Sequence, residues 1–380
     1  MSGFPARVVI TGGHGFLGWH TSCQLRAGHG IAPVRLGREQ FDDAAALQSA
    51  IACADVVIHL AGVNRADTAR AVELGNLGLA TRLAEAVRSA RRPVHIVYGN
   101  SIRASRDDAY GRGKAKAADI LQDAVAQVGG SLANVLLPNL FGEHGRPHYN
   151  SFVSTFSYML AVGETPEVHG DTEVPLLHAQ DAASVIIRAA AEFEDQIIEP
   201  SGEFQKVSSV LERLTEFRDI YATGEIPPLL DPFAVNLFNT FRSHLFPQHF
   251  PIYPTVNEDS RGELFEAVRA HGGTGMTFVS TTRPGRMRGD HYHLRKIERF
   301  FVISGEAEIS VRRLYDDKVV RFRLSGDKPG FVDMPTMWVH NISNVGVDDL
   351  VTVFWADQLL DNEKNPDQYP ARVDAEKSQL

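Results

Sequence analysis

Residues 285–298 of this chain read GRMRGDHYHLRKIE, and a further glycine, Gly305, follows seven residues later. His291 and His293 are two residues apart. Because side chains on a strand alternate between its two faces, both imidazoles would point to the same face. Glu298 follows after a short segment that can turn the chain back to a neighbouring strand. The stretch therefore predicts two strands of a small β-barrel with two imidazoles and a carboxylate on one side.

A third imidazole is offered further along the chain by His340, within the stretch PTMWVHNISN at residues 335–344. Imidazoles combined with a carboxylate form a nitrogen and oxygen ligand set that suits a divalent metal. The set contains no thiolate, which leaves zinc, iron, nickel and manganese open, and we favour zinc. A metal-free alternative also stands, in which the histidines are packed groups or act as acid–base groups.

A different signature opens the chain, where residues 8–18 read VVITGGHGFLG. An apolar strand runs into Gly12, Gly15 and Gly18, and a helix is expected to begin near Phe16. Such glycines allow a tight turn and a close approach of the backbone to a pyrophosphate, which the helix N-terminus favours electrostatically. The pattern predicts a dinucleotide site, although a glycine pattern alone is a weak signal.

A tyrosine and a lysine four residues apart, Tyr110 and Lys114, strengthen this prediction. On a helix the two side chains are one turn apart and share a face. A lysine cation beside a phenol lowers the pKa of the phenol, which suits it to exchange a proton near neutral pH. The alternative is an ordinary exposed pair on a helix.

The end of the second predicted strand, VRLGR at residues 34–38, bears on the choice of nicotinamide cofactor. An acidic residue at this position would bind the ribose 2′-hydroxyl and select NAD. This chain has no carboxylate there until Glu39, and Arg38 can pair with a 2′-phosphate through two hydrogen bonds. The stretch favours NADP(H) as the cofactor, and the alternative is a solvated surface arginine.

Composition limits the class of protein. The 380 residues are enough for two or three domains, and the net charge of −9 argues against a nucleic-acid binder. Because only seven residues precede the first predicted strand, we expect no signal peptide, and no apolar run reaches the roughly 18 residues of a membrane span. We expect a soluble, cytoplasmic protein with no nucleic-acid or membrane partner. The two cysteines, Cys23 and Cys53, are expected to be buried apolar side chains.

The pattern of expected elements changes near residue 246, which predicts domains at residues 1–245 and 246–380. The first part alternates strands and helices, which indicates an α/β fold with a doubly wound parallel sheet. The second part consists of short strands separated by turn residues, which indicates an all-β sandwich or barrel. In the first part strands are expected at 8–11, 33–36, 56–61, 94–98 and 134–137, and helices at 17–27, 44–52, 75–89, 109–128, 152–161 and 181–192. In the second part strands are expected at 276–281, 299–304, 307–313, 319–324, 330–334 and 350–355.

Residues 1–245 resemble the extended short-chain dehydrogenase/reductase family in the glycine turn, in residues 59–62, in Asn76 and in the Tyr110/Lys114 pair. The resemblance implies a Rossmann-type domain that binds NADP(H). It also implies that Tyr110 hands a proton to the substrate, that Lys114 holds the nicotinamide ribose, and that Ser101 is the third catalytic residue. The alternative for Ser101 is a loop serine that caps the next turn. The cofactor contacts implied are Gly12, Gly15, Phe16, Leu17, Arg38, Leu60, Ala61, Gly62, Asn76 and Lys114.

Residues 252–360 resemble the cupin superfamily. The first cupin motif is matched from Gly285 to Gly305, and the second keeps Pro335, His340 and Asn344. Met337 stands where the family usually has glycine, a departure that puts the local turn in question more than the ligand. The resemblance implies a cupin β-barrel whose metal ligands are His291, His293, Glu298 and His340.

A short-chain reductase fused to a C-terminal cupin resembles the bifunctional nucleotide-sugar enzymes of capsule and O-antigen synthesis, the CapF type, on the route to UDP-N-acetyl-L-fucosamine. In that family the cupin epimerises C3 of a UDP-2-acetamido-2,6-dideoxy-4-hexulose. The reductase then reduces the C4 ketone with NADPH to a UDP-2-acetamido-2,6-dideoxy-L-talose. The expected partners are a UDP-linked 4-keto-6-deoxy amino sugar and a second copy in a homodimer. Two alternatives stay open: a single-activity 4-ketosugar reductase with a structural or dimerising cupin, and a non-catalytic regulator that senses NADPH.

Overall fold

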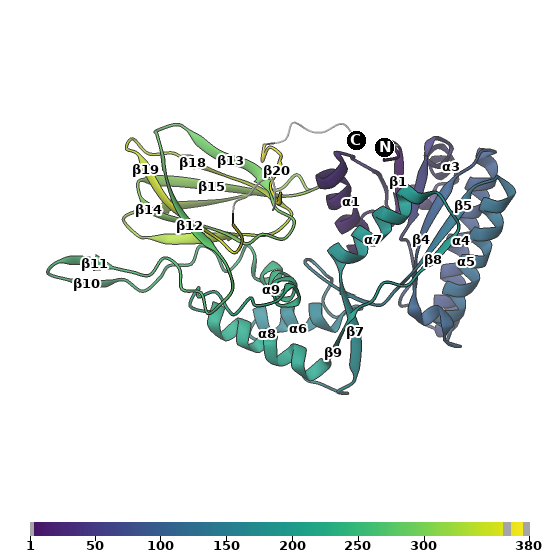
Figure 1. Cartoon of the computed structure of the whole chain (residues 1–380), viewed down its shortest axis with the longest axis horizontal. Coiled ribbons are helices and arrows are strands. Elements are labelled where there is room, and N and C mark those ends of the chain that lie inside the picture. The colour runs from purple at the N-terminus through teal and green to yellow at the C-terminus, as the bar shows by residue number, and fades with distance from the viewer. Residues whose placement is uncertain (1–3, 360–365, 375–380) are drawn as a thin grey trace. The chain divides into compact units, whose positions relative to one another are not determined.

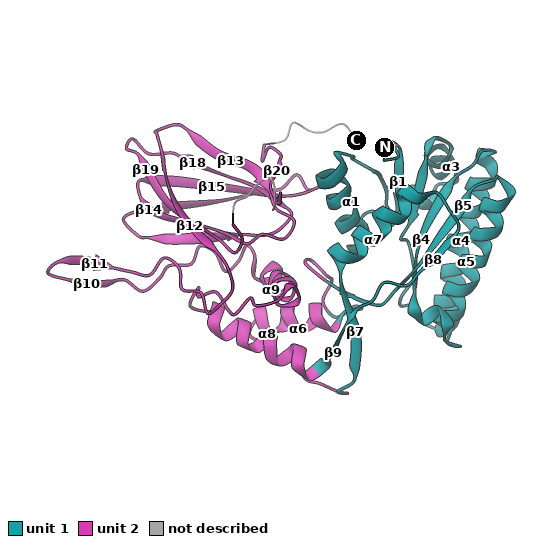
Figure 2. Cartoon of the chain, viewed as in Figure 1, with its two compact units in different colours: residues 1–141, 148–151, 171–207 teal, residues 142–147, 152–170, 208–380 magenta. Residues whose placement is uncertain are grey.

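The computed structural model describes residues 4–359 and 366–374. The chain divides into two compact units, which are coloured separately in Figure 2. Unit 1 consists of residues 1–141, 148–151 and 171–207, and unit 2 of residues 142–147, 152–170 and 208–380. The domain boundary after residue 245 stays a prediction.

A parallel sheet of six strands forms the centre of unit 1 (Figure 1). Its strand order is β2-β1-β3-β4-β5-β8, and every neighbouring pair is parallel. This confirms the doubly wound parallel sheet of a Rossmann-type fold. The strands are β1 (Val8–Thr11), β2 (Val34–Leu36), β3 (Val56–His59), β4 (His95–Ser101), β5 (Ser131–Leu137) and β8 (Gln196–Ile198).

Helices bury both faces of this sheet. One face packs against α1 (Phe16–His29) and α7 (Ala179–Glu192). The other packs against α3 (Ala44–Cys53), α4 (Ala69–Ala90) and α5 (Ala109–Gln127). Because a strand covered on both sides needs apolar residues at successive positions, β1 and β3 are buried along their whole length. The remaining elements of unit 1 are α2 (Arg38–Asp42), the 3₁₀ helix η1 (Ile102–Ser105) and a small sheet of β6 (Asn139–Phe141), β7 (Glu173–His178) and β9 (Glu203–Lys206).

Two details of unit 1 differ from the sequence prediction. Helix α4 begins at Ala69 rather than residue 75, because Thr68 caps it by accepting the backbone N–H of Ala71 at 3.1 Å. Cys23 is buried as expected, but Cys53 is exposed. Cys53 lies two residues, or about 200° of helical rotation, beyond the buried Ile51 and therefore faces away from the core.

Unit 2 combines three helices with two antiparallel sheets. The helices are α6 (Phe152–Ala161), α8 (Val207–Tyr221) and α9 (Pro232–Leu245). The sheets have the strand orders β12-β19-β14-β17 and β16-β15-β18-β13-β20, which confirms the all-β fold of cupin type. The strands are β12 (Met276–Thr282), β13 (Met287–Tyr292), β14 (Glu298–Ser304), β15 (Glu306–Arg313), β16 (Val319–Ser325), β17 (Gly330–Met334), β18 (Trp338–Asn344), β19 (Leu350–Ala356) and β20 (Tyr369–Pro370).

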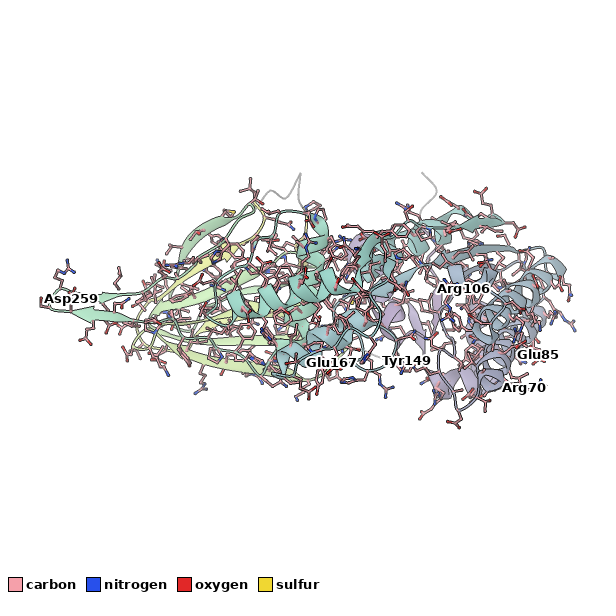
Figure 3. All side chains as sticks on the ribbon, turned by 90° about the horizontal axis from the view of Figure 1, so that it is seen from below. Arg70, Glu85, Arg106, Tyr149, Glu167 and Asp259 are labelled. Carbon is pink, nitrogen blue, oxygen red and sulfur yellow. The ribbon has the colours of Figure 1, made fainter. Side chains whose placement is uncertain are left out.

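A separate hairpin of β10 (Asn257–Asp259) and β11 (Gly262–Leu264) precedes the barrel, and Asp259 at its turn is exposed (Figure 3). Among the described residues, no helix has the length and apolar character needed to cross a bilayer.

A buried ion pair holds α8 against the barrel. Arg299 on β14 donates to Asp333 on β17 at 2.7 Å, and both residues are 1% exposed. The phenol of Tyr221, at the end of α8, donates to the same carboxylate at 2.6 Å. The ring of Phe331 lies 3.7 Å from the guanidinium carbon of Arg299. Because the charges are paired and hydrogen-bonded, they can be buried without the cost of an isolated ion.

Candidate functional sites

The glycine turn after β1 lies against the segment that follows β3. Gly12 has a φ of 67°, and a Cβ at this position would lie 2.7 Å from the backbone nitrogen of Ala61. The backbone N–H of Leu60 donates to the carbonyl of Thr11 at 3.0 Å. A Cβ on Gly18 would lie 2.3 Å from the carbonyl oxygen of Gly12. The structure thus brings together two groups of predicted cofactor contacts, the glycine turn at the carboxyl end of β1 and residues 60–62 at the carboxyl end of β3.

The first turn of α1 and the end of β2 flank the glycine turn. Gly15 is the N-cap of α1, and Phe16 and Leu17 form the first turn, where backbone amides favour an anion. Arg38, the first residue of α2, is exposed. The side chain of Arg35 donates to the carbonyl of Gly13 at 2.9 Å, so it braces the turn. An exposed Arg38 is compatible with a 2′-phosphate contact.

Asn76 holds the segment after β3 rather than presenting a spare amide group. Its Nδ2 donates to the carbonyls of Val63 and Val72 at 2.8 and 2.9 Å, and its Oδ1 accepts the N–H of Val63 at 3.1 Å. A Cβ on Gly62 would lie 3.4 Å from the same Oδ1. These bonds fix the backbone at Val63, next to residues 60–62, and a cofactor contact of Asn76 stays a prediction.

Ser101, Tyr110 and Lys114 meet at the carboxyl end of β4. Ser101 is the last residue of β4, and its side chain lies close enough to Tyr110 on α5 to lower the pKa of the phenol as a hydrogen-bonding neighbour. Lys114 is 4% exposed, and its Nζ donates to the carbonyl of Gly99 at 2.8 Å. The same Nζ lies 4.3 Å from the ring centroid of Tyr98. The three residues that the family resemblance singles out are therefore neighbours.

A chain of hydrogen bonds fixes Ser101 against α5. Its Oγ accepts the backbone N–H of Arg103 at 3.2 Å, which caps η1, so the capping expectation for this serine also holds. The Arg103 guanidinium donates to Asp108 at 2.8 Å, and Asp108 caps α5 by accepting the N–H of Gly111 at 2.8 Å. A Cβ on Gly111 would lie 2.3 Å from the Arg103 carbonyl, so only glycine allows this close approach.

The ionisation of Tyr110 differs from the sequence expectation. Burial raises the pKa of Tyr110, and the Ser101 hydrogen bond and the positive charge of Arg103 offset only part of this effect. The Arg103 guanidinium lies 5.2 Å from the Tyr110 ring centroid. Burial also lowers the pKa of Lys114 to about 7. The expectation that Lys114 lowers the pKa of Tyr110 is therefore wrong for the cofactor-free protein, because the Lys114 amine is bound at Gly99 and is itself desolvated.

Two further side chains lie beside this group, and no spacing rule assigned them a role. Tyr149 contributes to the electrostatic environment of Tyr110 and is labelled in Figure 3. Arg65 donates to the carbonyl of His148 at 3.2 Å, and its guanidinium carbon lies 5.7 Å from the Tyr149 ring centroid. The signal in the sequence is that residues 59–65 and 149–151 resemble the corresponding stretches of the CapF-type enzymes.

In unit 2, four side chains converge on one point: His291, His293, Glu298 and His340. Their ligand atoms all lie within 4.8 Å of one another. The Oε2 atom of Glu298 is 3.2 Å from the Nε2 of His293, 3.3 Å from that of His340 and 3.6 Å from that of His291. His291 and His340 face each other across the β13–β18 pairing. The structure thus assembles the whole predicted ligand set.

Two of these imidazoles are oriented by backbone carbonyls. The Nδ1 of His340 is hydrogen-bonded to the carbonyl of Trp338 at 3.0 Å, and the Nδ1 of His293 to the carbonyl of Asp367. A carbonyl can only accept, so each Nδ1 carries a hydrogen, and Nε2 is the ring atom that each imidazole presents to Glu298. These Nε2 atoms lie within hydrogen-bonding distance of the Glu298 Oε2 atom, and a divalent cation bound between them would take the place of the shared protons. The donor set therefore fits a divalent metal.

The protonation states of Glu298 and His340 also suit a metal. Burial by itself would raise the pKa of Glu298, but the neighbouring imidazoles of His291, His293 and His340 outweigh it and hold that pKa well below its usual value. Burial lowers the pKa of His340 to about 4. For His293 burial is opposed by the bond to Glu298 and its charge, and the pKa is raised. An ionised carboxylate and a neutral His340 are the forms that bind metal ions.

The second cupin motif keeps its turn although methionine replaces the usual glycine. Met337 has a φ of 61°, in the left-handed region that favours glycine, and it is fully buried. Its N–H donates to the carbonyl of His293 at 2.6 Å, and its carbonyl accepts the N–H of Leu314 at 3.1 Å. Two hydrogen bonds and a buried side chain offset the strained backbone, and His340 remains in the cluster.

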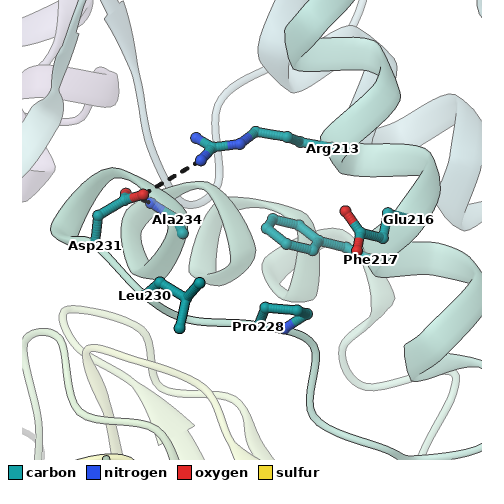
Figure 4. A pocket seen from close by; sticks show the side chains of 7 residues that line it. All are labelled: Arg213, Glu216, Phe217, Pro228, Leu230, Asp231 and Ala234. Atoms are coloured by element: carbon teal, nitrogen blue, oxygen red, sulfur yellow. Dashed lines mark hydrogen bonds and ion pairs between the residues drawn. The ribbon is translucent and has the colours of Figure 1, made fainter. Parts of the chain in front are cut away.

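A hollow of about 300 Å³ in unit 2 is drawn in Figure 4. Its lining includes Phe217 and Leu230, and Arg213 is paired there with Asp231 at 3.2 Å. None of the described residues that line it is among the predicted site residues. Because Arg213 and Asp231 pair with each other and no predicted site residue lines the hollow, we assign it no function.

Comparisons with known proteins agree with this geometry. Residues 8–199 match the NAD dependent epimerase/dehydratase family, and residues 257–369 match the polysaccharide biosynthesis C-terminal domain. The chain is 31% identical over 372 residues to the UDP-2-acetamido-2,6-beta-L-arabino-hexul-4-ose reductase of Pseudomonas aeruginosa (97% of this chain, 99% of that protein).

Solved structures with the same fold include the capsular polysaccharide assembling protein CapF from Staphylococcus aureus. It shares 30% identity at a TM-score of 0.60, over 96% of this chain and 100% of that one. A UDP-N-acetylglucosamine 4-epimerase from Methanobrevibacter ruminantium shares 16% identity at a TM-score of 0.53, over 66% of this chain and 100% of that one, which shows the fold alone. The chain therefore belongs to the NAD dependent epimerase/dehydratase family, and nearly its whole length is similar to CapF.

Proposed function

We propose that this protein is a bifunctional nucleotide-sugar enzyme of capsule or O-antigen synthesis. In this proposal the cupin part epimerises C3 of a UDP-2-acetamido-2,6-dideoxy-4-hexulose, and the reductase part reduces the C4 ketone with NADPH to a UDP-2-acetamido-2,6-dideoxy-L-talose. The observation that carries it is the meeting of Ser101, Tyr110 and Lys114 beside the glycine turn, in a chain that matches a UDP-hexulose reductase over 97% of its length. The cluster of His291, His293, Glu298 and His340 supports the epimerase half.

For the reduction, the chain supplies a proton and holds the reactants. NADPH, when bound, supplies the hydride for the C4 carbon. Tyr110 donates its phenolic proton to the C4 oxygen, and Ser101 orients the phenol through their shared hydrogen bond. The raised pKa of Tyr110 keeps the phenol protonated at neutral pH, which is the form that reduction needs. Lys114 holds the nicotinamide ribose, and an anionic cofactor nearby favours its charged form.

For the epimerisation, the C3 proton is acidified by the neighbouring C4 ketone. His291, His293, Glu298 and His340 would hold a divalent ion, which we propose to be zinc. The ion, when bound, supplies Lewis-acid polarisation of the substrate oxygens. The bonds from the Trp338 and Asp367 carbonyls keep two imidazoles in the orientation that presents Nε2.

The test is incubation of the full-length protein with the UDP-4-keto sugar in deuterated water, with and without NADPH, followed by NMR of C3. We expect deuterium at C3 without NADPH, and reduction of the ketone only with it. Elemental analysis of protein purified without affinity metal should find about one metal per chain, lost in His291→Gln together with C3 exchange. Full C3 exchange in metal-free protein would return the histidines to acid–base or packing roles.

A second candidate is a single-activity NADPH-dependent 4-ketosugar reductase whose cupin is structural or dimerising. The name of the Pseudomonas aeruginosa relative favours it, because that name states a reductase alone. The same incubation separates the candidates, since a reductase alone leaves the C3 proton in place. The homodimer stays a prediction that sedimentation of the purified protein can check.

A further inference from the structure

A short segment near the C-terminus, residues 366–374, is docked on the strand that carries His291. We call it the clasp segment. Its strand β20 pairs with β13, with Tyr369 opposite Tyr292 and Pro370 opposite His291. Val373 is fully buried, and its N–H donates to Asp290 at 3.2 Å. The clasp segment is therefore held in place along the edge of the ligand-bearing sheet.

A buried arginine adds to this attachment. The guanidinium of Arg312, which is 7% exposed, donates to the carbonyls of Val373 and Arg372 at 2.7 and 2.8 Å. Arg312 lies on β15, which pairs with the strand that carries His340. The attachment thus connects the clasp segment to β13, which carries His291, and to β15, the neighbour of the strand that carries His340.

Asp367, near the start of the clasp segment, binds the turn that joins two ligands. Its carboxylate accepts three successive backbone N–H groups, those of Leu294 at 2.6 Å, Arg295 at 2.8 Å and Lys296 at 2.7 Å. Three convergent N–H groups form an anion-binding concavity, and here a side chain of the same protein occupies it. The turn lies between His293 and Glu298, so the carboxylate sets the spacing of two ligands.

The backbone of Asp367 acts on the same site. Its carbonyl accepts the Nδ1–H of His293, which leaves Nε2 as the ring atom directed at Glu298 and available to a metal. The rest of the turn is held independently: Asn239 donates to the carbonyl of Arg295 at 2.8 Å, and Asp357 accepts the N–H of Ile297 at 2.9 Å. Loss of the Asp367 carboxylate would release one side of the turn while these bonds retain the other.

We propose that Asp367 is a positioning residue for the metal cluster. His293 and Glu298 reach their ligating positions only while the clasp segment is docked. The inference rests on the proposed function of the cluster as a metal site. Asp367 touches no ligand atom that faces the centre, so it acts through the turn and through the orientation of His293. A carboxamide cannot replace the carboxylate, because it carries no charge and its NH₂ group would face N–H donors.

The experiment measures zinc affinity of the full-length protein by competition with a chelating indicator, and the ligand-field absorption of the cobalt-substituted protein. Asp367→Asn should weaken zinc binding about 10- to 100-fold, as is usual when a ligand loses its orienting partner, and should change the cobalt spectrum. The matched control is Asp374→Asn in the same segment, because that side chain is 74% exposed and contacts only Arg321 at 3.5 Å in the described structure. Wild-type affinity and spectrum in Asp367→Asn would overturn the proposal.

A second measurement uses the unmutated protein, so that a variant that fails to fold does not decide the matter. If docking of the clasp segment favours metal binding, then by reciprocity metal binding must stabilise the docked segment. Hydrogen exchange of residues 366–374 should therefore slow when zinc is added to metal-free protein. Unchanged exchange in zinc-loaded protein would refute the role of the clasp segment. A wild-type protein that binds no zinc would instead refute the metal site itself, so the two failures are distinguishable.

Discussion

Tyr110→Phe should separate the two proposed activities. The substitution removes only the phenolic oxygen and keeps the ring beneath Arg103, whose guanidinium carbon lies 5.2 Å from the ring centroid. It leaves no large cavity and removes the phenol's contact with Ser101, which can contribute at most about 0.5–1.5 kcal/mol of stability. Loss of a positioned proton donor slows a reaction about 10²- to 10⁴-fold. The effect on ketone reduction should therefore be far larger than any effect through folding.

Two assays on the same preparation decide the outcome. NADPH oxidation should fall by about 10²- to 10⁴-fold, equivalent to about 2.7–5.4 kcal/mol on the barrier, while solvent exchange at C3 stays near the wild-type rate. Tyr253→Phe is the matched control, because Tyr253 is 43% exposed and lies outside the Tyr110 group. Loss of both activities in folded Tyr110→Phe protein would refute separate sites. Reduction within tenfold of wild type would remove Tyr110 as the proton donor.

Three further predictions follow from the structure. Arg38→Ala should raise the KM for NADPH about tenfold to a hundredfold and leave the KM for NADH almost unchanged. The reason is that a charge-assisted contact to the 2′-phosphate, which only NADPH carries, is worth roughly 1.5–3 kcal/mol. Equal effects on both cofactors would show that Arg38 does not select between them. Burial lowers the pKa of Lys114 to about 7 from its ordinary value of 10.5. Between these two pH values the unfolded chain therefore binds more protons than the folded protein. The contribution of Lys114 to the free energy of unfolding should accordingly rise with pH across that window. Lys114→Met should flatten this part of the pH profile, and an unchanged slope would contradict the assignment. Tyr221→Phe removes a buried hydrogen bond to Asp333 and should lower the free energy of unfolding, measured by denaturant titration, by roughly 1.5–3 kcal/mol. The control Tyr253→Phe should change the free energy of unfolding by less than about 0.5 kcal/mol.

Local rules explain why much of the fold and most of the site residues could be predicted. The glycine turn needs a residue at φ 67° and a close approach to Ala61, and only glycine meets both conditions without strain. Helical spacing places Tyr110 and Lys114 on one face, and strand alternation places His291 and His293 together. Elements were lost where the signal is short or polar, as in the three-residue strands β6 and β8 and the two-residue strand β20.

What the sequence by itself determined are the properties that depend on local patterns: the α/β fold with its parallel sheet, the all-β second part, and the placement of His291 and His293 on one strand. Tertiary structure alone decided that Lys114 is desolvated and has a pKa of about 7, since desolvation depends on the atoms that surround a group. It alone decided that the side-chain amide of Asn76 is hydrogen-bonded to the backbone of Val63 and Val72. It also placed Asp367 on His293 from 74 residues away along the chain. No periodicity encodes a contact of that length, because its partners become neighbours only after the barrel strands have paired.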